Sequence, residues 1–600
     1  SSQTAPKPSW KLEMPHNHNF TMPGLLEPVD EFALQADWGD KSHGKAYLAW
    51  ETARLQKLAN MQMFPIRVQR NGAFQGLYKF QEQFDGTWRD REGRGDDEVY
   101  KASSGAFVTT RKLFENRFEK KEGDALDYAN LEEFLDAIIP ENENSRQFTR
   151  ENVDIPEMIN FAAFVAIVKH VDSRNKNFYF ARESHSQRWE AFPWDLDLTW
   201  ATTCCGVTST FITATEPGDD TNKMLRVIMS DPVWREMYFR RLRTVVDQVY
   251  PAGVLEGWYD ARFAAAAADS NLDFQSWPYS GTYTYAQLRN QLFSSLATRR
   301  SQFAADTRIP SSQAADANVV ISELAVTPTA GDTAQFVELA NPTSGAIDVS
   351  GWTLSGAVTA TLQQGVVIPA GGAVSIVAND PAFRASYSGQ TFVGDRFSGA
   401  LATGETLTLT RTNGSVADEV TFGGDGWPTA TNGQTLSLNN LADDNGDGAN
   451  WSLSDRPGGT PSAANNSPDT AVVPGAPQMR LVSPGNGQAI VRWRAPFTDG
   501  GAAITSYSIQ ARNSAGAAFG APVVVPGTVR LGTVTGLTNG QGYTFVVQAI
   551  NRVGTGANSA ASTAVTPSAT VTVPGAPTTR TPTAGAAGGI TTAKCAWNAA

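Results

Sequence analysis

Two short polar segments carry side chains of the kinds that bind metal ions. The first reads HVDSRNKN, residues 170–177, and places an Asp and an Asn five residues apart after an apolar run. The second reads FPWDLDLTW, residues 192–200, and places two Asp residues among Trp and Phe. Burying a carboxylate beside aromatic rings is unfavourable unless its charge has a partner. These side chains are therefore either hydrogen-bonded structural groups or ligands of a metal ion.

Asp195 and Asp197 are expected to share one face of a strand, because side chains alternate along a strand. Trp194, Leu196 and Leu198 would then pack on the other face. Two carboxylates on one face repel each other unless a cation lies between them. The spacing favours a metal ion, although Asp197 alone could equally be a buried hydrogen-bond acceptor.

The first segment also has the spacing of a phosphoryl-transfer loop. Protein kinases use His-x-Asp-x-x-x-x-Asn, in which the Asp orients the acceptor hydroxyl and the Asn binds a metal ion. His170, Asp172 and Asn177 fit this spacing, and His170 is expected to orient the loop. Asp195 would complete a Mg²⁺ site, with Asp197 as a helper. The alternative is that Asp172 and Asn177 only cap a turn between a helix and a strand.

Length, charge and composition limit the number of domains and the classes of protein that the sequence can encode. Six hundred residues predict about three to five domains. A net charge of -12 argues against a dedicated nucleic-acid binder. The sequence contains no run of about 18 apolar residues, so we expect no membrane-spanning helix in it. The first residues do not form a signal peptide, but we expect the chain to be an excerpt of a longer polypeptide, so a signal could precede it. Cys204, Cys205 and Cys595 form no CxxC pair, and the adjacent pair is expected to be two free thiols.

Residues 1–307 are expected to form an α+β domain that positions the two polar segments. Strands are predicted at 10–14 and in a hairpin at 63–84, whose turn is Asn71-Gly72. Segments 175–182 and 187–197 are predicted to pair as two strands, which would bring the two polar segments together. Helices are predicted at 41–61, 130–140, 154–171, 222–250, 254–270 and 285–306.

The composition changes near residue 310, where domains of another kind are expected to begin. Residues 308–318 are predicted to be a linker. Residues 319–465 contain only alternating strands and turns, which is typical of a β-sandwich. VPGAP occurs at 473 and again at 573, which predicts a second sandwich at 473–570 and the incomplete start of another at 573–600.

The two predicted sandwiches resemble known modules. Residues 473–570 resemble a fibronectin type III module through Trp493, Tyr507, Leu537 and Tyr543. Residues 319–465 resemble a lamin-tail-type domain through ISELAV, FVELANPT, VSGWTLSG, VIPAGGAVSI and NWSLSDRPGGTPSAAN. Both resemblances imply immunoglobulin-like folds and say little about function.

Residues 1–307 resemble the spore-coat protein H (CotH) family of atypical kinases. The matching segments, in order, are SWKLEM, ALQADWGDKS, VQRNGAFQGLYKFQEQFD, VYKA, HVDSRNKNFYFAR, AFPWDLDLTW and MLRVIMSDPVWREMY. The resemblance implies a multidomain protein with an α+β atypical kinase-like domain followed by all-β immunoglobulin-like sandwiches. Residues 1–305 contain neither GxGxxG nor GxxxxGK[ST], which excludes the usual Gly-rich phosphate loops and leaves the atypical class.

The same resemblance implies residues that hold ATP. Lys11 lies on the family's early strand, Lys101 lies in its Tyr-Lys motif, and either could also be a solvent-facing lysine. Glu82 matches a family Glu and is expected to pair with one of these lysines. In that family the opening strand follows an Arg-Gly-Asn-Ser-like turn, and Ser1-Ser2 resembles the end of that turn.

A second, weaker metal motif lies in the first predicted sandwich. DDNGDG at 443–448 contains the start of a calcium loop in Asp443, Asn445 and Asp447. Ser454 stands at the twelfth position, where such loops carry Glu, so a solvated acidic turn is the alternative.

The expected function is a secreted or surface-associated kinase that transfers the γ-phosphate of ATP, with Mg²⁺, to Ser or Thr of an extracytoplasmic protein. The sandwiches would bind a cell-surface or matrix partner. The first alternative is a catalytically idle surface or matrix adhesion protein. The second is a metal-dependent hydrolase built on Asp195 and Asp197, which is poorly supplied with His ligands.

Overall fold

A computed structural model gives the fold of the chain in two compact units, Ser1–Thr470 and Ala471–Ala600, which are treated separately. It describes residues 5–569 apart from 16–17, 23–24, 39, 41, 104–116, 123–127, 140, 175, 201–221, 279–282, 388–392, 432, 455–456, 464, 466–471, 497–499, 501–503, 528 and 552. Beyond residue 569 it describes only the short strands β28 (Thr578–Thr579), β29 (Thr583–Ala584), β30 (Ala593–Lys594) and β31 (Trp597–Asn598). The three cysteines lie outside the described residues.

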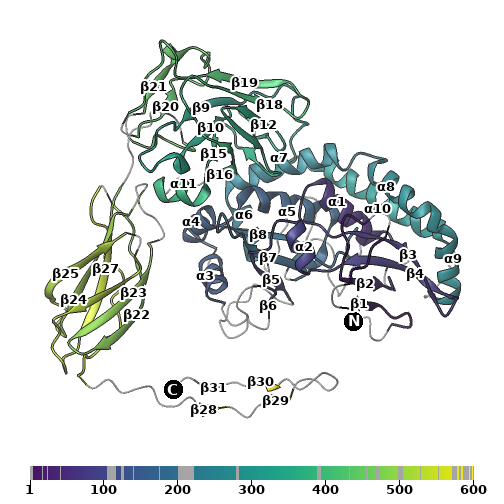
Figure 1. The fold of residues 1–600 in the computed structure, drawn as a ribbon, viewed down its shortest axis with the longest axis horizontal. Helices are drawn as coiled ribbons and strands as arrows, with labels where there is room; N and C mark the ends of the chain where they lie inside the picture. Colours follow the sequence, from purple (N-terminus) through teal and green to yellow (C-terminus); the bar gives the residue numbers. More distant parts are fainter. Residues whose placement is uncertain are drawn as a thin grey trace. The chain divides into compact units, whose positions relative to one another are not determined.

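The N-terminal domain, residues 1–307, begins with a four-stranded antiparallel sheet (Figure 1). Its order is β1 (Trp10–Glu13), β2 (Glu31–Gln35), β4 (Ala73–Glu82) and β3 (Met63–Arg70). The predicted hairpin is confirmed. Asn71 and Gly72 both have positive φ, 51° and 81°, which matches the right-handed twist of the paired strands.

A second antiparallel sheet lies deeper in the N-terminal domain. Its order is β6 (Phe118–Lys120), β5 (Glu98–Ala102), β7 (Phe178–Arg182) and β8 (Trp189–Pro193). The predicted pairing of β7 with β8 is confirmed, with Phe178 opposite Pro193 and Arg182 opposite Trp189. Because β8 is buried along its whole length, this hairpin is a fixed part of the core.

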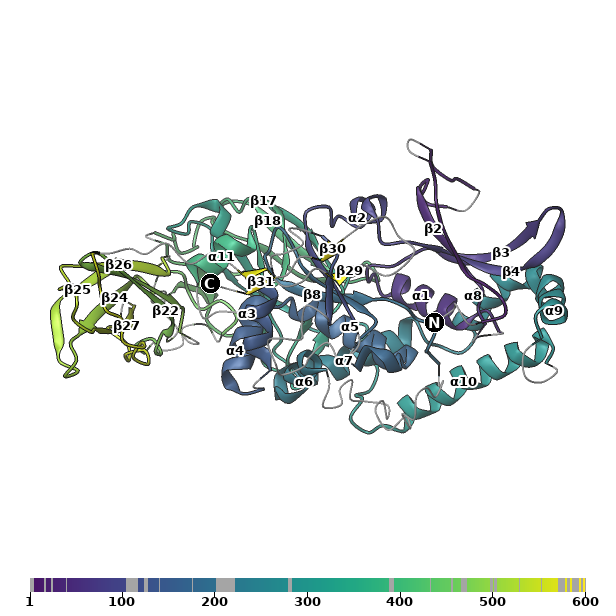
Figure 2. The same cartoon turned by 90° about the horizontal axis from the view of Figure 1, so that it is seen from below.

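Helices fill the rest of the N-terminal domain. They are α1 (Lys45–Leu55), α2 (Gly86–Arg91), α3 (Ala129–Ile138), α4 (Glu143–Asn152), α5 (Ile155–Val168), α6 (Lys223–Ser230), α7 (Pro232–Gln248), α8 (Val254–Phe263), α9 (Ala267–Ser276) and α10 (Tyr285–Ala305). The single helix predicted at 222–250 is two, because Asp231 accepts from the first amides of α7 and Pro232 opens it. Figure 2 shows α8 and α9 beside the β3–β4 hairpin, which they contact. None of the described helices is long and apolar enough to cross a membrane.

Helix α5 is the centre of the N-terminal domain. Asp154 caps its first turn by accepting from the Glu157 amide at 3.1 Å, and Pro156 occupies that turn, as predicted. Every residue of α5 except Glu157 is buried. The helix stops at Lys169, whose φ of 52° is left-handed. A helix that is apolar on nearly all sides is a core helix. Helix α5 runs from its cap at Asp154 to the HVDSRNKN segment, which follows its last turn.

The first sandwich, residues 319–465, packs two sheets around an apolar core. One sheet has the order β16 (Val393–Arg396), β15 (Ala373–Val377), β10 (Phe336–Ala340), β9 (Val320–Leu324), β20 (Leu436–Leu438) and β21 (Trp451–Leu453). The other has the order β17 (Ser398–Gly399), β13 (Val358–Thr361), β12 (Thr353–Gly356), β18 (Thr406–Thr410) and β19 (Val416–Thr421), and β11 (Ile347–Asp348) pairs with β14 (Val367–Ile368). The expectation of strands and turns alone was incomplete. Helix α11 (Asp380–Ser386) forms because Asn379 caps it and Pro381 opens it.

The second unit contains the second sandwich. Its two sheets are β22 (Gln478–Gly485), β23 (Gln488–Arg494), β26 (Leu531–Thr535), and β25 (Ala518–Pro526), β24 (Ser506–Arg512), β27 (Thr544–Ile550). Trp493, Tyr507 and Tyr543 are buried between them. Trp493 and Tyr543 are core residues, as the resemblance to a fibronectin type III module implies.

Two buried carboxyl groups face each other in the first sandwich. Glu323 on β9 lies opposite Glu338 on β10, and their exposed fractions are 0% and 1%. Thr435 and Ser437 hydroxyls donate to Glu323, and the Ser322 hydroxyl donates to Glu338 at 2.6 Å. Burial, followed by the charge of Glu323, raises the pKa of Glu338 well above its usual 4.5. A proton on this pair therefore stabilises the folded sandwich.

The pair predicts an unusual pH dependence of stability. Because the folded pKa of Glu338 lies above the unfolded one, its contribution is present at low pH and is lost as the pH rises from about 4.5. The free energy of unfolding of the variant Glu338→Gln should decline less between pH 5 and pH 8 than that of the wild type, by about 1 kcal/mol or more. Urea unfolding at each pH measures this, with the exposed Glu419→Gln as a matched control. Parallel pH curves for Glu338→Gln and the wild type would contradict it.

Candidate active site

The HVDSRNKN segment folds as a tight loop directly after α5. Residues Val171–Arg174 form a short 3-10 turn, η3. The buried His170 ring donates from Nε2 to the backbone oxygen of Asp195, at 3.2 Å, and its Nδ1 accepts from the Ser173 hydroxyl. Burial lowers the pKa of His170 to about 4, so the ring is neutral near pH 7. His170 therefore fixes the loop against the second polar segment and carries no charge.

Asn177 joins the two polar segments. Its side-chain Nδ2 donates to Asp172 Oδ2 at 2.9 Å and to Asp195 Oδ2 at 3.2 Å. Its backbone amide donates to Ala102 on β5 at 3.1 Å. The structure thus brings Asp172, Asn177 and Asp195 together around one amide group, although Asp172 and Asp195 are 23 residues apart in the chain.

The expectation that Asp195 and Asp197 share one face of a strand is wrong. Strand β8 ends at Pro193, and Asp195 has a left-handed φ of 53°. Asp tolerates this conformation better than most residues do, and the pairing with β7 ends at Phe178, so nothing extends the strand. The two carboxylates lie in the turn that follows the hairpin.

The two carboxylates still influence each other. Burial, followed by the charge of Asp195, raises the pKa of Asp197 to about 7, even though part of its side chain reaches solvent. Burial also raises the pKa of Asp195, against the opposing charge of Lys101. Crowded carboxylates of this kind attract a cation.

A buried lysine that the sequence analysis missed lies behind these carboxylates. Lys79 on β4 is 0% exposed and forms an ion pair with Asp37. Burial alone would lower the pKa of Lys79, but the charges of Asp37, Asp40 and Asp197 outweigh it and raise that pKa. The available signal was a lysine between Tyr78 and Phe80, in the part of β4 from Gly76 to Glu82 that is buried.

The lysines expected to bind phosphate occupy different environments. Lys101 on β5 places its Nζ 5.0 Å from the centre of the Trp194 ring, and burial lowers its pKa. Lys11 on β1 has a side chain that is 64% exposed and forms an ion pair with Glu31 on β2. A further lysine, Lys176, contacts Asp172 Oδ2 at 3.0 Å. Lys101 and Lys176 are therefore the cations beside the carboxylates.

Glu82 is not paired with either expected lysine. It is 1% exposed, forms an ion pair with Arg91 on α2, and accepts from the Gln62 amide at 2.9 Å. The neighbouring arginine takes the place of the lysine that the resemblance implied, because α2 follows β4 directly in the chain. The role of Glu82 in this structure is to fix α2 against the first sheet.

The residue types around Asn177 fit a hard cation such as Mg²⁺. Asp172, Asp195 and Asn177 can all present oxygen, which Mg²⁺ prefers. The Asn177 amino group lies between two carboxylates, which is the position where their negative charges would attract a cation most strongly. Rotation of the amide by 180° would present its oxygen, Oδ1, at the same position. Over the part of the chain that the structure describes, no three His, Cys, Asp or Glu side chains form a metal cluster by themselves, and a cation bound at this point would use the amide oxygen as a further ligand.

The predicted calcium loop uses its side chains elsewhere. Asn445 is buried and donates to Ile321 O at 3.1 Å and to Asp418 Oδ2 at 2.7 Å. Asp447 accepts from the Ala449 amide at 2.9 Å, which caps the turn η7 (Gly448–Asn450). This geometry favours the structural turn over calcium binding by Asp443, Asn445 and Asp447.

Comparison with known families agrees with this architecture. Residues 1–303 match the family described as CotH kinase protein, residues 312–424 match Lamin Tail Domain, and residues 475–565 match Fibronectin type III domain. A kinase-like fold with appended β-sandwich modules is therefore the class of protein. Because the first match spans half of the chain, the chain belongs to the CotH kinase protein family.

Similar solved structures include the twitchin kinase region from C. elegans, titin kinase with its flanking domains, and the FN5 domain of Drosophila Lar. Their identities are 24%, 26% and 30%, with TM-scores of 0.15, 0.15 and 0.14. Each match covers 16% of this chain and 17%, 18% and 98% of the respective structure. The chain thus spans less than a fifth of the first two, and these matches add nothing to the assignment of residues 1–303.

The Lys79–Asp37 pair predicts a large effect on stability. Removing one partner of a buried ion pair leaves the other charge without compensation, so Lys79→Met should lower the free energy of unfolding by about 3–5 kcal/mol. The double variant Lys79→Met with Asp37→Asn should recover part of that loss. Urea unfolding measures both. The exposed Lys57→Met serves as the control and should stay within about 0.5 kcal/mol of the wild type. A similarly small change for Lys79→Met would show that the pair is not buried in solution.

Proposed function

We propose that this CotH-family chain is a protein kinase that uses ATP and Mg²⁺ to phosphorylate Ser or Thr hydroxyls. The observation that carries the proposal is the Asn177 amide, which joins Asp172 to Asp195. It brings an Asp and an Asn at kinase-loop spacing to the same point as a downstream Asp. Lys101 and Lys176 add positive charge at this point.

Asp172 is the group that orients the acceptor. In the proposed step the acceptor hydroxyl oxygen forms a bond to the γ-phosphorus, the bond from that phosphorus to the β–γ bridging oxygen breaks, and ADP leaves. The hydroxyl proton passes to Asp172. His170 holds the loop that carries Asp172, as its two hydrogen bonds to Ser173 and Asp195 allow.

The metal site would consist of Asn177 and Asp195, with Asp197 beside them. Bound Mg²⁺ would neutralise phosphate charge. Lys101 is the better candidate for a phosphate contact than Lys11, because the charge of Lys101 already acts on Asp195, whereas Lys11 is exposed and paired with Glu31. Lys79 would support the site from behind by offsetting the charge of Asp197.

The acceptor is proposed to be an extracytoplasmic protein, and the chain to be secreted or displayed at the cell surface. The support is the order of its parts, a CotH domain followed by lamin-tail and fibronectin type III modules. In this proposal the fibronectin type III sandwich binds a surface or matrix partner.

Loss of either carboxylate should abolish phosphoryl transfer. Asp172→Ala removes the hydroxyl-orienting group and Asp195→Ala removes a metal ligand, so each should reduce turnover by about 100-fold or more. The measurement is transfer of labelled γ-phosphate to protein acceptors, with Asp96→Ala in an exposed turn as the control. Full activity in both active-site variants would refute the proposal and favour the idle interaction protein.

Nucleotide should bind only with the metal ligands in place. A non-hydrolysable ATP analogue with Mg²⁺ at about 100 times its Kd should add about 2.7 kcal/mol to the stability of the wild type, and this appears as a raised unfolding midpoint. Asp195→Ala should lose most of that increase. An equal increase in Asp195→Ala would show that the ion binds elsewhere, and no increase in the wild type would contradict nucleotide binding.

A further inference from the structure

The first sandwich is built onto the N-terminal domain, within the same compact unit. Figure 1 shows it above α7, which contacts β11 and β14. Even the predicted linker is held, because the side chain of Gln313 exchanges two hydrogen bonds with the backbone of Asp348, at 2.7 and 2.9 Å. Residues 308–318 are therefore part of an interface and not a free tether.

A buried arginine joins the sandwich to α5. Arg241 on α7 is 1% exposed and donates to Asp348 Oδ2 at 3.2 Å and to Gln364 Oε1 at 2.9 Å, both in the sandwich. The same guanidinium donates twice to Asn160 Oδ1 on α5, at 2.9 and 3.1 Å. Asn160 in turn donates to the Gln56 backbone oxygen after α1. The Arg241 guanidinium thus connects α7, α5 and the first sandwich.

A second buried arginine holds the start of α5. Arg188, in the turn before β8, contacts Asp380 Oδ2 of the sandwich at 2.6 Å and Asp154 Oδ2 at 3.1 Å. Asp154 is the residue that caps α5, and Gln363 of the sandwich also donates to it at 3.2 Å. Separating the two domains would leave Asp380, which is 0% exposed, without Arg188.

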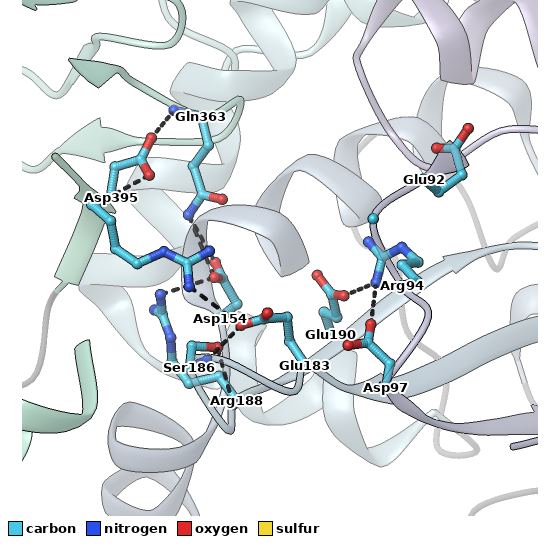
Figure 3. Close-up of a pocket in the computed structure, with 12 residues that line it drawn as sticks. Glu92, Arg94, Asp97, Asp154, Glu183, Ser186, Arg188, Glu190, Gln363 and Asp395 are labelled. Atoms are coloured by element: carbon cyan, nitrogen blue, oxygen red, sulfur yellow. Dashed lines mark hydrogen bonds and ion pairs between the residues drawn. The ribbon is translucent and has the colours of Figure 1, made fainter. Parts of the chain in front are cut away.

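Arg188, Asp154 and Gln363 line a charged cavity between the two domains (Figure 3). It has a volume of about 210 Å³ and receives Arg94 and Glu190 from the N-terminal domain and Gln363 and Asp395 from the sandwich. Figure 3 shows Arg188, Asp154 and Gln363 pointing toward one another across the boundary. The contacts of Arg188 and Gln363 at this cavity thus converge on Asp154, the cap of α5.

The backbones of the two domains also touch at α5. Gly365 of the sandwich has a φ of +89°, and a Cβ at this position would lie 2.0 Å from the Pro156 carbonyl oxygen. Gly371 in the same sandwich also has a positive φ, +62°, but a Cβ there would meet nothing within 4 Å. Gly365 therefore permits a close approach to the first turn of α5 that no larger residue allows.

Helix α5 transmits its position to the candidate active site. Its fourteen residues span about 21 Å at 1.5 Å per residue. At its far end Arg299 donates to the Ala166 carbonyl, at 3.1 Å from Nε, and His170 and Asp172 follow within six residues. A rigid buried helix that tilts at its start also moves at its end.

We infer that the lamin-tail sandwich is a positioning module of the kinase-like domain. It holds the first turn of α5 through Asp154, Pro156 and Asn160, and thereby fixes the loop that carries Asp172. The catalytic consequence rests on the proposed function, whereas the docking and its effect on α5 do not.

The test compares two glycine substitutions in the full chain. Gly365→Ala and Gly371→Ala both place a Cβ at a positive φ, +89° and +62°, which disfavours any residue other than glycine, but only the Gly365 Cβ would meet the Pro156 carbonyl oxygen. Gly365→Ala should accelerate hydrogen exchange of the amides in residues 155–177 by about tenfold, and Gly371→Ala should leave that segment unchanged. Equal exchange in the two variants would overturn the inference.

Two further measurements keep the test decisive. If Gly365→Ala does not fold, the milder double variant Gln363→Ala with Gln364→Ala replaces it and should give the same direction of change. Phosphoryl transfer, if the proposed function holds, should show a lower kcat in the variant with KM for ATP nearly unchanged. If the wild type transfers no phosphate, the proposed function fails, and the exchange experiment still decides whether the sandwich positions α5.

Discussion

The burial of α5 is the constraint on which the rest of this unit depends. A helix that is apolar on nearly every side can only be placed by surrounding it, and β8, α1, α6, α7, α10 and the first sandwich contribute to that surrounding. Its polar contacts include Asp154 at the start, Asn160 in the middle and the Ala166 carbonyl near the end. Each of these groups contacts a buried arginine. These three polar contacts fix the position of α5 along its own axis, which apolar packing alone specifies less well.

A small number of hydrogen bonds also positions the carboxylates of the candidate active site. Asp172 and Asp195 come from segments that the β7–β8 hairpin separates, and two neutral groups connect them, the Asn177 amide and the His170 ring, while Lys176 contacts the Asp172 carboxylate from outside. Neutral donors can be displaced by an incoming cation at little electrostatic cost. A site whose carboxylates were already held by arginine would be much harder to load with a metal ion.

Much of this arrangement was predictable from the sequence, where the signal is local. The Asn71-Gly72 hairpin, the pairing of β7 with β8, the cap of α5 and the core roles of Trp493 and Tyr543 all depend on residues near one another in the chain. The loop spacing selected Asp172 and Asn177 for the same reason, and the predicted pairing of β7 with β8 brought Asp195 to them. The conformation at Asp195 was not predictable, because periodicity continues past Pro193 although strand pairing does not. The pairing of Lys79 with Asp37 and the contacts of Arg241 with Asn160 and Asp348 depend on distant segments, which no local pattern reports.

The network around Arg241 has a consequence for where this protein can be divided. The family boundary at residue 303 falls between elements that share buried charges, so a cut there would expose the guanidinium of Arg241 on one fragment and the carboxylate of Asp348 on the other. The family boundaries therefore divide this chain differently from its compact structural units, because one unit contains both the CotH domain and the lamin-tail domain. The lamin-tail module is a family match of its own, but it shares the buried ion pairs of Arg241 and Arg188 with the N-terminal domain, and the two compact units of the chain divide only after Thr470.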